Sequence, residues 1–372
     1  MNPIFSLKRH FPVTLAIAAW LVVTCIAWQA SAQTSVDQSG TAQQNPSAAP
    51  DAQKTMTIHV QVSDSQAHAI EGLQESDFTL LDNKQPQKLL GFRAVDAAIL
   101  KSDPVQVVIA VDMVNSDPVT VAREREEVGA YLKSNGGELP NPTSLAVIAD
   151  SGVKVLPLSS QRGDLLLASF NQTQSEIRQV GRSAGFYGAT ENAQKSLQEM
   201  GQLIQYEGQK PGRKMVVFVS PGWPLLIAAG EQSDSKQRTW VFNSVVQMET
   251  LLRASNVTLY CVDPFDLGRR NPFEYEGYLK GVSAAKDATY PDLGLQVFAT
   301  HTGGQVFASG RDIAGSLKIA VREASEGYDL TFAPAPGDRV DEYHALEVRV
   351  SKPNVKVRTT TGYYAHVHGN GR

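Results

Sequence analysis

The residues most able to do chemistry begin with Asp112, which closes the apolar stretch Val105–Asp112 (VQVVIAVD). β-Branched residues dominate this stretch, which predicts a strand that is covered on both faces of a sheet. The polar loop Met113–Pro118 (MVNSDP) follows directly. Because loops at the carboxyl ends of parallel strands are where α/β proteins bind their ligands, Asp112 marks either a metal-binding loop or a loop that has lost its metal.

A second chemical pattern is Gly181–Gly185 (GRSAG), which fits the G-x-S-x-G turn of serine hydrolases. Ser183 is followed along the chain by Asp263 and His301, in the order that α/β-hydrolases use. That turn needs an apolar strand directly before the serine, whereas the polar segment 171–180 precedes it here. We therefore expect no enzyme, and a serine hydrolase using Ser183 is the alternative from another functional class.

Alternating strands and helices must position these residues. The pattern predicts a doubly wound, mostly parallel sheet with helices on both faces. The tight turn Asp150–Gly152 (DSG) joins two apolar stretches into a hairpin, which supplies one antiparallel edge strand. The expected strands are 105–112, 143–150, 153–159, 213–220, 257–263 and 305–309, and the expected helices are 119–135, 162–172, 191–207, 238–256, 291–304 and 312–327.

β-Rich segments flank this α/β part on both sides. Thr55–Asp64 (TMTIHVQVSD) alternates apolar and polar residues with period two, and the same period returns from Tyr328. The later stretches YDLTFAP, EYHALEVRVS and VKVRTTTGYYA are each expected to form one strand. Because the two ends of an inserted domain usually lie close together, the flanks are expected to pair into a single β-sandwich that is split in the sequence.

The predicted organisation has five parts. They are a signal peptide (1–32), a disordered linker (33–54), the first part of the split β domain (55–98), the α/β domain (103–326) and the second part of the β domain (327–368). The linker is rich in Gln, Ser, Ala and Pro and has too little apolar surface to offset the entropy of ordering.

The first thirty-two residues have the layout of a secretory leader. Lys8 and Arg9 precede an apolar run at 11–28, and Ala30–Ala32 (ASA) offers a small-residue cleavage site. The alternative is an uncleaved membrane anchor, because the apolar run is close to the length that spans a bilayer. The leader predicts an exported protein, either periplasmic or extracellular, with no membrane insertion after cleavage.

Composition limits the partners. Loss of the leader makes the chain two units more negative than its formal net charge of −4, because the leader holds two basic residues and no acid. Nucleic acids and anionic lipids need a basic face, so we expect neither as a partner. The mature chain would keep only Cys261, which excludes an internal disulfide and predicts a buried thiol.

Three stretches carry a resemblance to a known family. GLQESDFTLLDNKQPQKLLGF, VQVVIAVDMVNS and DEYHALEVRVSKPNVKVRTTTGYYA are similar to segments of the VWFA-related family first defined in Acidobacteria. The resemblance covers residues 55 to 366, and its α/β part resembles a von Willebrand factor type A domain. It implies a type A-like fold, an exported protein, and a role in adhesion or protein interaction instead of catalysis.

Type A domains often hold Mg²⁺ through a D-x-S-x-S loop, so the resemblance also implies a ligand set. Asp112 and Ser116 match its first and fifth positions, whereas Val114 falls on the third, where a hydroxyl is required. An isopropyl group cannot coordinate a cation, and the amide of Asn115 is one position out of register. The first loop therefore keeps one carboxylate and one hydroxyl for a cation that prefers six oxygens.

The other two loops are also incomplete. Thr190 matches the threonine of the second loop, but it is equally suited to be the N-cap of the helix that follows. The third loop reads Ser220–Trp223 (SPGW) and has no acid where the family has aspartate. We expect a degenerate site in which Asp112 hydrogen-bonds loop amides, with no resident cofactor. Mg²⁺-dependent adhesion through Asp112 and Ser116 is the alternative.

A partner-binding rim is expected beside this loop, at the carboxyl ends of the strands. Its aromatic, apolar and arginine residues have the composition of a protein interface, which predicts an unidentified protein partner. The proposed rim residues are Asn115, Trp223, Leu225, Phe265, Arg269, Arg270, Phe273 and Tyr275.

Overall fold

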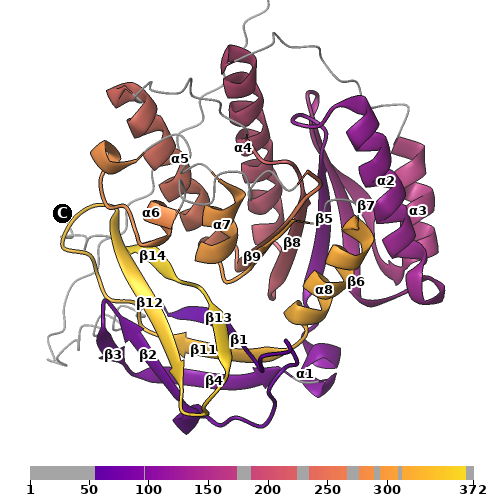
Figure 1. Ribbon diagram of the computed structural model, residues 1–372. Helices are drawn as coiled ribbons and strands as arrows, with labels where there is room; N and C mark the ends of the chain where they lie inside the picture. The colour runs from indigo at the N-terminus through magenta and orange to yellow at the C-terminus, as the bar shows by residue number, and fades with distance from the viewer. Residues whose placement is uncertain are drawn as a thin grey trace, which may run out of the picture. The chain divides into compact units, whose positions relative to one another are not determined.

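A six-stranded sheet with the order β10-β9-β8-β5-β6-β7 lies at the centre of the α/β part (Figure 1). The computed structural model describes residues 55–95, 97–173, 186–223, 234–265, 276–288, 294–308 and 312–365. The strands of this sheet are β5 (Gln106–Asp112), β6 (Glu138–Ala149), β7 (Gly152–Arg162), β8 (Lys214–Val219), β9 (Val257–Asp263) and β10 (Val306–Ala308). Five of them run parallel and β7 pairs antiparallel to β6 at the edge, which confirms the expected mostly parallel sheet with one antiparallel edge strand.

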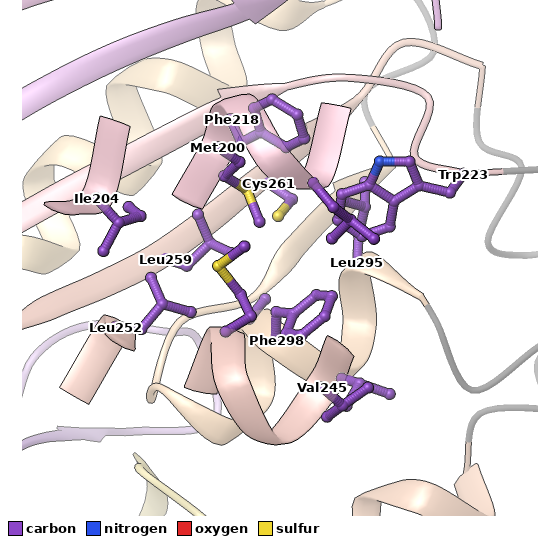
Figure 2. Packing of buried hydrophobic residues seen from close by; sticks show 14 of the residues in the cluster. Met200, Ile204, Phe218, Trp223, Val245, Leu252, Leu259, Cys261, Leu295 and Phe298 are labelled. Atoms are coloured by element: carbon purple, nitrogen blue, oxygen red, sulfur yellow. The ribbon is translucent and has the colours of Figure 1, made fainter. Parts of the chain in front are cut away.

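Helices cover both faces of this sheet (Figure 1). One face packs against α4 (Phe186–Gly208), α5 (Ser235–Ala254) and α7 (Leu295–His301), and the other against α2 (Pro118–Lys133), α3 (Gly163–Gln172) and α8 (Ile313–Ala324). Figure 2 shows the first of these cores, in which Cys261 lies among Met200, Leu259 and Phe298. The thiol of Cys261 is free and buried, as predicted. No helix in the described ranges is long and apolar enough to cross a membrane.

The two flanks pair with each other. β1 (Met56–Ser63), from the first flank, lies between β11 (Gly327–Phe332) and β13 (Lys356–Thr359), from the second, and β4 (Leu89–Val95) pairs with β11. In the other sheet, β12 (Glu342–Val350) lies between β2 (Phe78–Asp82) and β14 (Gly362–Ala365), and β3 (Gln85–Gln87) pairs with β2. Apolar side chains from both sheets share one core, which is the sandwich packing expected from the alternating sequence.

Two local expectations were wrong. The stretch VKVRTTTGYYA does not form one strand: β13 and β14 belong to different sheets, and Thr360–Thr361 carries the chain between them. The helix expected to follow Thr190 begins earlier, at Phe186, so Thr190 lies inside α4 and is not its N-cap. A short helix, α1 (Ala97–Ser102), was not expected and joins β4 to the α/β part.

A buried carboxylate connects the sandwich to the α/β part. Asp329 of β11 lies 2.8 Å from His59 Nδ1 of β1, and its Oδ2 accepts hydrogen bonds from Arg93 Nε and Nη2 of β4 at 3.1 and 2.7 Å. Arg213, just before β8, approaches Asp329 to 3.8 Å. Burial alone would raise the pKa of Asp329, but the hydrogen bond from His59 and the charge of Arg213 hold it well below its usual range.

Asp329→Asn is expected to destabilise the chain by about 3 kcal/mol at neutral pH, because breaking a buried ion pair leaves the arginine charges uncompensated. The depressed pKa contributes stability above the ordinary pKa of aspartate, so the difference from wild type should shrink as the pH falls below about 4. Urea unfolding at several pH values measures both effects.

The matched control is Asp103→Asn, which removes the charge of the half-exposed second partner of Arg93 and should cost no more than about 1 kcal/mol. Equal losses for both variants would contradict the assigned role of Asp329.

Candidate functional site

Asp112 lies at the point where the strand order of the sheet reverses. The chain leaves β5 through α2 to β6 on one side, and it returns through α4 to β8 on the other side. Such switch points open a crevice at the carboxyl ends of the strands. Asp112 closes β5, Ser220 directly follows β8, and Ser196 reaches the same point from α4.

Five protein hydrogen bonds end on the carboxylate of Asp112. Oδ1 accepts from the amides of Val114 at 2.9 Å and Asn115 at 3.3 Å. Oδ2 accepts from Asn115 Nδ2 at 2.7 Å, Ser220 Oγ at 2.8 Å and Ser196 Oγ at 3.0 Å. The carboxylate is fully buried, and its lone-pair directions are occupied by protein donors.

Burial and hydrogen bonding act on Asp112 in opposite directions. Burial raises the pKa of its carboxyl, and the hydrogen bonds from Asn115, Ser220, Val114 and Ser196 partly offset that rise. The donors are neutral amides and hydroxyls, so they stabilise the carboxylate without placing a formal positive charge beside it. The arrangement can hold a loop in one conformation, and it offers no exposed oxygen for coordination.

Val114 turns away from the loop and into the core. Its side chain packs in the same apolar cluster as Trp223, Phe218 and Phe298. The indole of Trp223 stacks on Phe218 with ring centres 6.3 Å apart and meets Phe298 edge-on at 5.6 Å. Figure 2 labels these three side chains. The position where a D-x-S-x-S loop would present a hydroxyl is thus occupied by a buried methyl pair.

Ser116 contacts a residue that the sequence analysis missed. Its hydroxyl donates to Glu124 Oε1 at 3.0 Å, and Glu124 is fully buried in α2 although its neighbours in the sequence are mostly charged. Helical spacing was the available signal, because Val121, Glu124 and Val128 share the face that packs on the sheet. Burial raises the pKa of Glu124 to about 8. The hydrogen bond from Ser116 lowers this pKa and the nearby charge of Asp112 raises it, but burial is the largest cause.

Ser196 of α4 hydrogen-bonds Asp112, whereas Thr190, which matches the threonine of the second loop, lies nearer the start of the same helix. Ser196 was missed because nothing in its surroundings distinguishes it from the other polar residues of the helix. The described residues contain no group of three His, Cys, Asp or Glu side chains that could hold a metal ion.

Three members of the expected rim can be placed. Asn115 is half-buried and bonded to Asp112, Trp223 is a core residue and so does not face a partner, and Phe265 is 38 % exposed. The other rim residues lie outside the described residues: Leu225, Arg269, Arg270, Phe273 and Tyr275.

One rim residue was not expected. Val119, in the first turn of α2, is 81 % exposed. One turn later, the guanidinium of Arg123 lies 5.6 Å from the ring centre of Phe265, and its Nη2 donates to the carbonyl of Pro264 at 3.1 Å. Val119 and Arg123 are one helical turn apart, and the half-buried Arg123 contacts Phe265; we call these three residues the rim patch.

The residues of the hydrolase alternative have other partners where they are described. Ser183 lies outside the described residues. His301 Nδ1 lies 2.6 Å from Glu249 Oε1, and Asp263 Oδ1 accepts from the amide of Phe265 at 2.8 Å. The second of these contacts is a turn of the kind that an aspartate at a strand end commonly forms.

Glu124→Gln is expected to change how stability depends on pH. In wild type the folded carboxyl keeps its proton up to about pH 8, whereas the unfolded one loses it near pH 4.3. Wild-type stability should therefore fall as the pH rises through this window, and the variant should be more stable than wild type at pH 9 by roughly 3 to 5 kcal/mol. Denaturant unfolding between pH 4 and 9 measures this slope. The exposed Glu126 gives the matched control Glu126→Gln, and a slope unchanged in the Glu124 variant would refute the assignment.

The chain was compared with protein-family models, curated proteins and solved structures. No protein-family model matches it, and no curated protein does. Among solved structures, it is similar to the SpRpn10 VWA domain (TM-score 0.21, 14 % identity, 42 % of this chain and 74 % of that one). It is also similar to the pilus adhesin SpaC from Lactobacillus rhamnosus GG (TM-score 0.35, 12 % identity, 69 % and 36 %) and to the TFIIH p34 N-terminal domain (TM-score 0.22, 12 % identity, 44 % and 82 %). These TM-scores are too low to support an argument, and the fold is established by the strand order and pairing of the sheet.

Proposed function

We propose that this chain is an exported, non-enzymatic protein-interaction module. Its type A-like α/β part would carry a degenerate metal site, in which protein hydrogen bonds take the place of the cation. The finer assignment, to the VWFA-related family first defined in Acidobacteria, belongs to the same proposal and rests on the three sequence stretches that resemble it. Export rests on the leader at residues 1–32.

The proposal rests on the carboxylate of Asp112, both oxygens of which accept hydrogen bonds from protein donors. A Mg²⁺ ion would need at least one of its oxygens, and each is held by two or three protein donors. Coordination would break these bonds in a fully buried place and leave donors unpaired, which costs about 1–3 kcal/mol for each group. Mg²⁺ also gives up its own water reluctantly. Both costs oppose the alternative of Mg²⁺-dependent adhesion.

The rim patch supports a protein partner. Val119 and Phe265 expose apolar surface beside an arginine, and arginine and aromatic residues are enriched among the strongest contacts of interfaces. The hydrogen bond from Arg123 to the carbonyl of Pro264 holds the patch in one arrangement, which lowers the entropy lost on binding. No described contact favours the hydrolase alternative.

Metal addition is expected to leave the melting temperature unchanged. A cation that binds only the native state stabilises it by an amount that grows with its concentration above the dissociation constant. Thermal unfolding in millimolar Mg²⁺, in millimolar Mn²⁺ and in EDTA measures this directly. A melting temperature that rises with either metal, and falls again in Ser116→Ala, would overturn the degenerate-site proposal and revive metal-dependent adhesion.

Val119→Ser is expected to weaken capture of the partner about tenfold, because it removes most of the apolar area of one exposed side chain. The measurement is a pull-down from cell-envelope extract, with the captured proteins quantified against wild type. Val340→Ser is the matched control, since Val340 is 74 % exposed in the loop between β11 and β12, away from the rim. If both variants capture the same proteins as wild type in the same amounts, the rim patch is not the binding surface.

A further inference from the structure

A polar cavity of about 200 Å³ lies between the α/β part and the sandwich. Its walls come from α5 and α7 on one side, and from β1, β4, β11 and β14 on the other (Figure 1). One end is open to solvent at Arg93 and Asp103, whose side chains are about 40 % exposed, whereas the side chains of Glu249 and His301 at the other end are almost fully buried. A small molecule could therefore enter at one end and be enclosed at the other.

The buried end holds two polar atoms that no described residue satisfies. His301 Nδ1 and Glu249 Oε1 are 2.6 Å apart, but His301 Nε2 and Glu249 Oε2 have no hydrogen-bond partner within the described ranges. Buried side-chain polar atoms are nearly always bonded, so two unpartnered ones that belong to the lining of the same cavity require an explanation. Orientation by a carboxylate is also how proteins fix an imidazole for a ligand on its other nitrogen.

The hydrogen-bonding roles of these atoms define the ligand. A carboxylate oxygen such as Glu249 Oε2 accepts hydrogen bonds, and His301 Nε2 donates or accepts according to the tautomer of the imidazole. A hydroxyl group can both donate and accept, so a ligand with several hydroxyl groups can satisfy both open atoms. Threonine side chains from several elements also line the cavity and can both donate and accept: Thr57, Thr250, Thr258, Thr302 and Thr360.

The charges of the lining residues limit which ligands the cavity can favour. The acids of the lining are Asp103, Asp329 and Glu249, and the arginines are Arg93, Arg213 and Arg253. The two sets balance, so neither a cation nor an anion is favoured by the net field. Tyr363 and Tyr364 add aromatic surface to the wall, and the volume suits one small ring. We infer that this cavity binds a neutral polyhydroxylated molecule of monosaccharide size, with hydroxyl groups hydrogen-bonded to Glu249 and His301. This site is separate from the rim patch and does not depend on the proposed function.

Saturation-transfer NMR on the full chain tests the inference with D-glucose, D-galactose and myo-inositol as neutral probes. Glycine and acetate serve as the charged comparisons. Wild type should bind at least one polyol, and Glu249→Gln should weaken that binding about tenfold, because the amide nitrogen replaces an acceptor oxygen with a donor. Glu207→Gln is the matched control: Glu207 is a buried glutamate of α4 outside the cavity, and its exchange should leave binding unchanged.

A second readout uses wild type alone, so it does not depend on the folding of a variant. Adding the bound polyol should shift the imidazole ¹⁵N resonance of His301 Nε2, and the resonances of the exposed His68 should stay in place. The inference is overturned if no polyol binds, if only glycine or acetate binds, if both glutamine variants bind like wild type, or if the His301 resonance does not respond.

Discussion

The pairing of β4 with β11 is the constraint on which the rest of the structure depends. The chain leaves the sandwich after Val95 and returns at Gly327, and these two residues lie directly opposite each other in register. All of the α/β part is thus built between two hydrogen-bonded neighbours. Two positions further along β11, Asp329 faces Arg93 on one side and His59 on the other, so the buried charges reinforce the same junction. Their mutual compensation matters because an unpaired charge there would face a desolvation cost of several kcal/mol.

The candidate site follows from a related problem, which is how to hold a buried carboxylate at the switch point of a sheet. Asp112 is satisfied by two loop amides, one side-chain amide and two hydroxyls. These donors come from three separate elements, so the hydrogen bonds also join β5, α4 and the end of β8. The carboxylate consequently acts as a structural centre of the rim. Asp112 has no exposed surface in this arrangement.

Much of this architecture could be predicted, because local patterns determined it. β-Branched runs predicted the buried strands, and Asp117–Pro118 predicted the start of α2, where Asp117 accepts from the amides of Val119 and Thr120. What could not be predicted depended on tertiary context. The contact of Ser196 with Asp112 depends on how α4 packs against the loop after β5. The burial of Glu124 depends on which face of α2 packs against the sheet. The break between β13 and β14 lies within a run of small polar residues and glycine, whose sequence does not say which sheet each side joins.

The split sandwich also sets an order of events during folding. β1 and β2 are synthesised early, but their partners β11, β12 and β13 follow only after the whole α/β part. Pairings between residues so far apart in sequence close slowly, whereas consecutive strand–helix units can form as they emerge. The first flank must therefore wait with its strand edges unpaired until the last flank arrives.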